Sequence, residues 1–303
     1  MYQPPIVNFP VFSVAWASET DDKGNTTPAI AAVGGGGAGK TGVGNKISLI
    51  GFDGATGGRP SHNIEFELET SPHTSNFVTV DDSGQLLAAA FGRNAHIYAS
   101  GPSGLVLLAE FKVDEAEKES GINSMAFASP LLGGRGQSKS EGTRWLLATG
   151  GEDGVMRVWV LSTGNGSECA PRKGGGSNAN RQEKMDSLKA ALVGECRGHL
   201  KPITCLRFHP CRDIILTSSK DGTSRLGAWD WQQGREVALL PATVGLPPSV
   251  SAGSVMCRSC CFSPDGERAF TAQSAPRGKA YVTEWSFGLS EGEGEGPGRG
   301  RRC

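Results

Sequence analysis

The sequence lacks a strong net charge, a high aromatic content and any long apolar run. Its 30 Lys and Arg residues nearly balance its 31 Asp and Glu residues, and a net charge of −1 gives no general reason to expect nucleic-acid binding. No N-terminal segment has the apolar core of a cleavable secretion signal, and no run of 18 or more apolar residues is present to span a membrane. We therefore expect this chain by itself to be soluble, with no nucleic acid among its partners.

A repeated pattern accounts for much of the 303-residue chain, in which 44 glycines suit many tight turns. The clearest copy begins at Gly198-His199, passes through the turn at Lys220-Asp221-Gly222 and ends at Trp229-Asp230. An earlier copy, without the Gly-His pair, runs from Ile122 to Trp159 through the turn at Glu152-Asp153-Gly154. This is the pattern of a WD repeat, in which each copy forms one four-stranded blade of a β-propeller.

Three weaker copies flank these two and begin at Val11, Phe77 and Cys257. Each has short β-rich runs separated by turn residues. We therefore predict an all-β fold, a WD-repeat β-propeller over residues 1–290 with five blades visible, followed by a low-complexity tail at residues 291–303. Two insertions, at residues 133–142 and 162–183, are rich in Gly, Ser, Asn, Lys and Arg and are predicted to be disordered loops.

Polar residues inside the repeats have a structural explanation. In WD repeats the histidine of the Gly-His pair and a turn aspartate form a hydrogen-bond network with a Ser or Thr and a Trp. No arrangement typical of a Ser-His-Asp site or of paired catalytic carboxylates stands out against this background. The residues expected to have such structural roles are His199, Asp221, Trp229, Asp153 and Trp159.

Eight cysteines raise the question of a metal site. Cys257 and Cys260 are three positions apart on a predicted strand, and this offset is expected to point their side chains to opposite faces of the sheet. That geometry argues against zinc. Cys257 and Cys261 are instead expected to share a face, as small buried positions of a blade.

Residues Gly34–Asn45 read GGGGAGKTGVGN and follow an apolar run at residues 29–33. They match the phosphate-binding pattern G-x-x-x-x-G-K-[ST] at four positions and also contain the dinucleotide pattern G-x-G-x-x-G. Both kinds of nucleotide site require a helix directly after the loop. The four positions that match the first pattern are Gly34, Gly39, Lys40 and Thr41.

A helix is not expected after this loop. Gly42 and Gly44 each cost about 1 kcal/mol relative to Ala inside a helix. Residues 46–52 then alternate between polar and apolar side chains, which is typical of a strand. The sequence therefore predicts a strand, a glycine-rich loop and a second strand, and a P-loop NTPase is only the third of the functions considered.

With WD repeats around it, the glycine run resembles one family: the endoplasmic-reticulum guanine-nucleotide exchange factor for the small GTPase of COPII coats, called prolactin regulatory element-binding protein in animals. The matching features are, in order, an N-terminal Pro-Phe/Val strand, an Ala-rich strand, four glycines, a Lys-Thr-Gly triplet and an asparagine. The blades then follow in a similar order. The matched positions in the loop are Gly34, Gly35, Gly36, Gly37, Lys40, Thr41, Gly42 and Asn45.

The resemblance implies a role at the cytosolic face of the endoplasmic-reticulum membrane. In that family the loop binds a potassium ion and reaches the GTPase, and its terminal asparagine is needed for exchange. The resemblance therefore implies that Asn45 promotes exchange and that the matched loop residues bind the partner. An exchange factor shifts a conformational equilibrium of its partner without covalent chemistry, so no nucleotide is expected to bind this chain itself. The carbonyl groups implied as potassium ligands are those of Gly34, Gly35, Gly36 and Gly37.

The chain also departs from that family, whose members carry a transmembrane helix after a seven-bladed propeller. We interpret it as C-terminally incomplete, and expect a membrane only through a C-terminal anchor absent from this chain. An unclosed propeller is expected to leave sheet edges and blade faces bare. The alternative function is a generic WD-repeat interaction scaffold without exchange activity.

Asn45 is expected to be exposed at the end of the loop. On that expectation, Asn45→Ala changes stability by no more than about 0.5 kcal/mol while slowing exchange strongly. Gly39 and Gly44 are expected to be the less constrained glycines of the loop.

Overall fold

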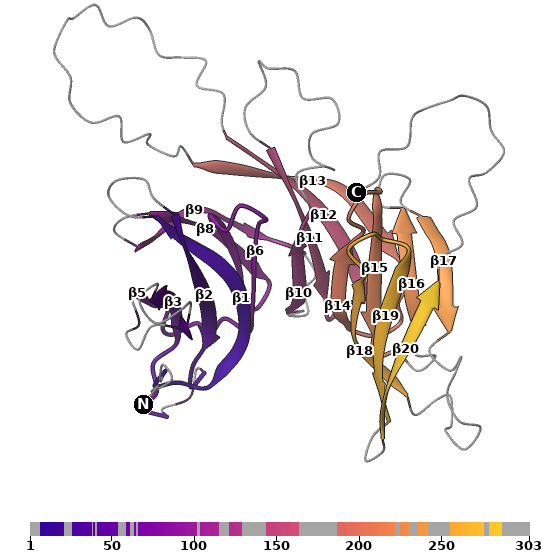
Figure 1. Cartoon of the computed structure of the whole chain (residues 1–303), viewed down its shortest axis with the longest axis horizontal. Helices are drawn as coiled ribbons and strands as arrows, with labels where there is room; N and C mark the ends of the chain where they lie inside the picture. Colours follow the sequence, from indigo (N-terminus) through magenta and orange to yellow (C-terminus); the bar gives the residue numbers. More distant parts are fainter. Residues whose placement is uncertain are drawn as a thin grey trace, which may run out of the picture.

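The computed structural model describes residues 7–20, 26–37, 39, 41–53, 59–60, 64, 66–101, 104–114, 121–128, 144–163, 187–221, 225–230, 235–241, 255–275 and 279–286. Within these residues every regular element is a β-strand, and the strands form five antiparallel sheets (Figure 1). No helix capable of crossing a membrane is found in this part of the chain. Lys40, the insertion at 133–142, most of the second insertion and the tail at 291–303 lie outside the described residues.

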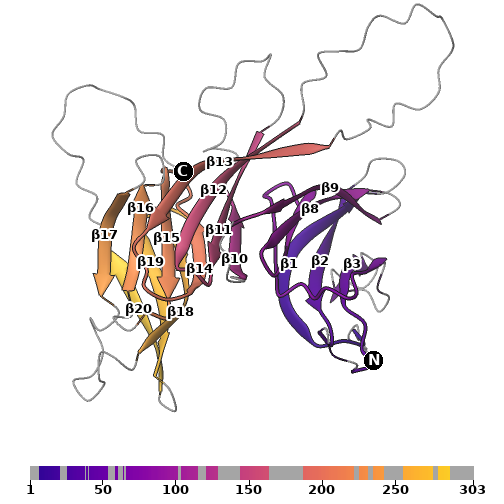
Figure 2. The ribbon, with the colours of Figure 1, turned by 180° about the vertical axis from the view of Figure 1, so that it is seen from behind.

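The five sheets follow one another in chain order, and each corresponds to one predicted repeat (Figures 1 and 2). Blade 1 contains β1 (Val11–Thr20), β2 (Thr26–Gly34), β3 (Lys46–Asp53), β4 (Arg59–Pro60) and β5 (Phe66–Glu69); blade 2 contains β6 (Phe77–Val80), β7 (Leu86–Phe91), β8 (Asn94–Gly101) and β9 (Gly104–Lys112); blade 3 contains β10 (Ile122–Phe127), β11 (Arg144–Gly151), β12 (Val155–Thr163) and β13 (Leu188–Arg197); blade 4 contains β14 (Ile203–Phe208), β15 (Ile214–Ser219), β16 (Arg225–Asp230) and β17 (Arg235–Pro241); blade 5 contains β18 (Met256–Phe262), β19 (Arg268–Ser274) and β20 (Ala280–Ser286).

The second insertion begins later than predicted. Ser162 and Thr163 still belong to β12, where they pair with Lys189 and Leu188 of β13. The polar side chains of residues 162 and 163 do not end the strand, because their backbone groups still pair with β13.

Four apolar clusters fill the four seams between neighbouring blades. The seam between blades 1 and 2 is typical: Val33 and Leu49 of blade 1 pack against Leu87 and Phe91 of blade 2. Full burial of one such Leu or Phe side chain contributes about 1.5 to 3 kcal/mol. Because each seam needs an apolar face on both of its blades, the strands of a blade between two seams are apolar on both faces, as the fully buried β7 illustrates.

β1 is exposed along one of its faces. Phe12, Val14 and Trp16 alternate along the strand and are 54%, 61% and 70% exposed, and the Trp16 ring stacks on Phe52 of β3 at 5.4 Å. The residues between them face blade 2. This face of β1 is therefore apolar and exposed. At the other end, blade 5 has three strands among the described residues, and Val282 of β20 is 75% exposed.

The prediction for the cysteines of β18 is wrong. Cys257 and Cys260 are both buried, whereas Cys261 is exposed. The cause is a register shift between Cys257 and Ser259 in the pairing of β18 with β19, because a β-bulge inserts one residue and reverses the alternation that follows it. Among the described residues, no group of three or more His, Cys, Asp or Glu side chains is arranged to hold a metal ion.

Candidate functional site

The glycine loop joins β2 to β3, and these two strands pair antiparallel with Gly34 opposite Lys46. The strand, loop and strand that the sequence predicts are therefore confirmed. A phosphate-binding loop would have to lead into a helix whose N-terminal amides hold the phosphate, and here a strand follows instead. This geometry excludes the P-loop and dinucleotide interpretations of the glycine pattern.

Asn45 is not exposed as expected. Only 1% of its surface is accessible, and its side-chain amide is held on both sides. The oxygen accepts hydrogen bonds from the Gly37 N–H at 2.9 Å and the Thr74 hydroxyl at 2.8 Å. The nitrogen donates to the carbonyl oxygens of Gly37 at 3.1 Å and Pro72 at 3.3 Å. Asn45 therefore ties Gly37 of the loop to the connection between β5 and β6.

The orientation of this amide follows from its partners. The nitrogen faces two carbonyl oxygens, which can only accept hydrogen bonds, and the oxygen faces a backbone N–H. Rotating the amide by 180° would place its oxygen against the oxygens of Gly37 and Pro72 and lose both bonds. The Thr74 hydroxyl, which can rotate, donates to the amide oxygen in the observed arrangement.

Two glycines of the loop are required by this arrangement for different reasons. A Cβ atom on Gly35 would lie 2.3 Å from the Asn45 side-chain oxygen and 2.5 Å from the Asn45 Cα atom, so only glycine fits beside Asn45. Gly37 has open space around it but a φ of 77°, which other residues adopt only with strain. Gly39 needs neither condition, because an added Cβ would meet the Thr41 side chain at an ordinary 3.6 Å.

Carbonyl oxygens are the ligands that a potassium ion takes in selectivity filters, and two of the predicted ones have known partners in the loop. The Gly36 oxygen accepts a long hydrogen bond of 3.5 Å from the Thr41 hydroxyl, and the Gly37 oxygen accepts one from Asn45. Each carbonyl oxygen has a second lone pair that these bonds do not use. Gly34 lies at the end of the β2 ladder. The potassium site stays a prediction.

A second segment, the connection between β5 and β6, completes the site. This segment is not predicted from the sequence. Besides Thr74 and Pro72, it supplies the Ser71 hydroxyl, which accepts a bond from the Asn45 N–H at 3.3 Å, and the Thr70 N–H, which donates to the Asn45 carbonyl at 2.7 Å. A hydrogen bond from the Ser71 hydroxyl lowers the pKa of Glu69. No sequence motif marks this segment, because its role comes from lying beside a loop far away in the chain.

The residues expected to form the structural network of the WD repeats make their contacts within the blades. In blade 4, His199 bonds to Thr217 at 2.8 Å and to Asp221 at 3.2 Å, and all three are buried. In blade 3, the Trp159 indole donates to Thr149 at 3.1 Å.

Other predicted members of these networks differ between blades. Asp153 accepts a bond from the Val155 N–H and pairs with Arg157 at 2.8 Å, so in blade 3 the turn aspartate has an arginine as a partner, whereas Asp221 of blade 4 has His199. The Trp229 side chain lies outside the described residues. These contacts join strands within blades, and none of them reaches the glycine loop.

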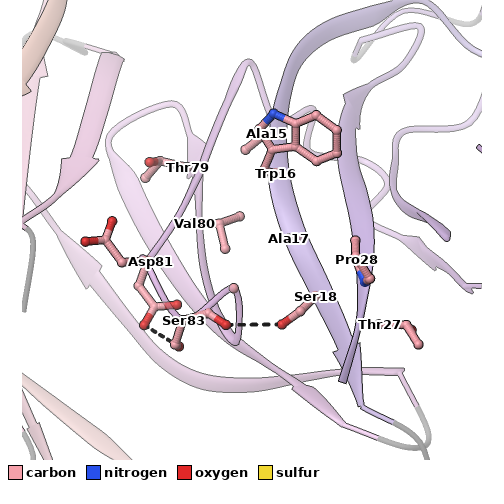
Figure 3. A pocket seen from close by; sticks show the side chains of 12 residues that line it. Ala15, Trp16, Ala17, Ser18, Thr27, Pro28, Thr79, Val80, Asp81 and Ser83 are labelled. Carbon is pink, nitrogen blue, oxygen red and sulfur yellow. Dashed lines mark hydrogen bonds between the residues drawn. The ribbon is translucent and has the colours of Figure 1, made fainter. Parts of the chain in front are cut away.

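A pocket of about 560 Å³ lies between β1 and the β6–β7 turn, and it contains no residue of the glycine loop (Figure 3). Ser18 closes one end by bonding to the Ser83 carbonyl. The Asp81 carboxylate is occupied by its own turn, where it accepts bonds from Ser83 and Leu86. The Asp81 carboxylate of this pocket therefore serves the turn, and we place the candidate site at the loop.

Comparison with known proteins agrees with the fold. The family described as "WD domain, G-beta repeat" matches residues 190–227. No curated protein shows a significant match to the sequence. The structure of Sqt1 from Chaetomium thermophilum is similar with a TM-score of 0.52 at 20% identity, covering 91% of this chain and 62% of that one.

A second structure of Chaetomium thermophilum Sqt1, bound to the N-terminus of the ribosomal protein L10, is similar with a TM-score of 0.50 at 19% identity over 91% of this chain and 64% of that one. The chain thus spans less than two thirds of the length of these proteins. At this identity the likeness shows the fold alone. Together with the five repeated sheets, it establishes that the chain has the fold of a WD-repeat β-propeller.

Proposed function

We propose that this chain is a protein-interaction domain that contacts its partner through the loop Gly34–Asn45. The observation that carries the proposal is the way the loop is built. Its base is held by the buried Asn45 amide, while Gly39, Thr41 and Gly42 at its apex are exposed. A preorganised loop loses less conformational entropy when a partner binds, which suits it to recognition.

The fold supports the same general role. One protein with a similar fold, Sqt1, has been solved with the N-terminus of a ribosomal protein bound to it. Blades packed side by side provide a rigid frame, and exposed loops positioned by such a frame commonly carry function.

The more specific function that we propose is nucleotide exchange on the small GTPase of the COPII coat, at the cytosolic face of the endoplasmic reticulum. Its support is the order of the loop residues between two β-strands and the reliance of the loop on Asn45. In this function the loop favours a GTPase conformation that holds GDP weakly. Potassium bound by loop carbonyls would add rigidity, and Asn45 would act by fixing the shape of the loop.

The test is fluorescent GDP release from the COPII GTPase, combined with direct binding by calorimetry. Gly39→Trp places a bulky side chain at the exposed apex, where an added Cβ meets only the Thr41 side chain at an ordinary 3.6 Å. Leu200→Trp, at a position 78% exposed at the start of blade 4, is the matched control. We expect the wild type and Leu200→Trp to accelerate release and Gly39→Trp to lose most of that acceleration. If the wild type binds the GTPase without accelerating GDP release, the scaffold function is supported instead. If the wild type does not bind the GTPase, this choice of partner is refuted.

A further inference from the structure

The connection between β5 and β6 is the second half of the loop site. Resting on the proposed role of the loop, we propose that Thr74 is a positioning residue: its hydroxyl holds the correctly oriented Asn45 amide in place, and through that amide stabilises the conformation of Gly37. The consequence is that a partner's affinity for the loop depends on a residue that lies outside it.

Among the groups that bond the Asn45 amide, Thr74 differs from the others because it uses its side chain. Gly37 and Pro72 contribute main-chain atoms, which a substitution at either position would leave in place. Thr74 contributes a side-chain hydroxyl, 2.8 Å from the amide oxygen. Within the described residues, its hydroxyl is therefore the contact to this amide that mutation can remove without altering the loop itself.

Removing this hydroxyl has a defined effect. The amide oxygen is buried and would keep the Gly37 N–H as its single donor, and a buried acceptor with fewer bonds is less stable in that orientation. The amide would then rotate more freely, and the left-handed Gly37, held by it from both sides, would open more often. The loop apex would remain chemically unchanged but less ordered.

The matched control lies in the same connection. Thr70 has the same side chain, and its hydroxyl bonds to the His73 carbonyl at 2.9 Å rather than to the Asn45 amide. Thr70→Val and Thr74→Val thus remove the same chemical group from the same segment. Thr74→Ser keeps the hydroxyl and removes only a methyl group.

The experiment measures hydrogen exchange of the Gly37 amide by NMR, with partner binding measured in parallel. We expect Thr74→Val to speed Gly37 exchange roughly fivefold, the factor that corresponds to one net hydrogen bond of about 1 kcal/mol. Thr74→Ser and Thr70→Val should stay within about twofold of the wild type. Partner affinity should fall with Thr74→Val and be restored with Thr74→Ser.

Each outcome decides the proposal. Unchanged Gly37 exchange in Thr74→Val, or a Thr74→Ser variant as fast as Thr74→Val, overturns it whatever the partner does. Faster Gly37 exchange with unchanged partner affinity supports the positioning role and refutes the loop as the partner site. If Thr74→Val does not fold, Thr74→Ala provides the test, because it removes the same hydroxyl without adding a methyl group in its place: Gly37 should exchange faster in Thr74→Ala than in Thr74→Ser, and equal rates would overturn the proposal.

Discussion

Asn45→Ala is the substitution whose effect on the free energy of unfolding can be worked out most directly from the structure. The side chain takes part in four hydrogen bonds, with the N–H and the carbonyl of Gly37, the carbonyl of Pro72 and the hydroxyl of Thr74. A typical intramolecular hydrogen bond contributes about 1 kcal/mol net. Because the loop lies at the surface, water can reach some of the released groups, and we expect a loss of about 2 to 3 kcal/mol rather than the full sum.

A loss of this size is measurable by urea unfolding and by calorimetry. For a chain of this size it corresponds to a decrease in Tm of roughly 3 to 5 °C. Asn76→Ala is the control, because Asn76 is exposed and its amide donates one bond, to the Ile122 carbonyl at 3.1 Å. A change of less than about 0.5 kcal/mol for Asn45→Ala, the value usual for an exposed position, would show that the amide does not hold the loop as described.

Three further predictions follow from the same structure. Gly35→Ala should destabilise the chain by more than 1 kcal/mol, roughly the cost of a forced close contact, because the new Cβ would lie 2.3 Å from the Asn45 oxygen, whereas Gly39→Ala should be neutral by urea unfolding. Burial lowers the pKa of His209, whose Nδ1 accepts a bond from the Cys211 N–H, so its contribution to stability is present above the unfolded pKa of about 6.5 and is lost as the pH falls through the lower folded pKa. Unfolding free energies at pH 5.5 and 7.5 should therefore differ more for the wild type than for His209→Gln, and equal differences would contradict this. Replacing potassium by lithium at constant ionic strength should slow stimulated GDP release, and equal rates would argue against a bound ion.

The fold could be predicted from the sequence because the turn and strand patterns of each repeat extend over only a few neighbouring residues. The Gly-His and Trp-Asp positions and the Asp-Gly turns mark where strands begin and end. In the structure Gly198 directly follows β13, Asp221 lies shortly after the end of β15, and Asp230 ends β16. The glycine loop was also predictable as a link between strands, since Gly42 and Gly44 disfavour a helix and the alternation of residues 46–52 favours β3. These features depend on backbone preferences within a few residues.

The burial of Asn45 could not be predicted from local sequence. An asparagine at the end of a glycine-rich loop is typical of an exposed turn, and its burial results from Pro72 and Thr74, which belong to the connection between blades 1 and 2. Likewise, the inward side chains of Cys257 and Cys260 depend on a bulge that arises when β18 pairs with β19. A sequence pattern specifies which strands form, because strand propensity and turn chemistry act locally, whereas the contacts of a loop and the register of a strand are settled only when segments distant in the chain pack together.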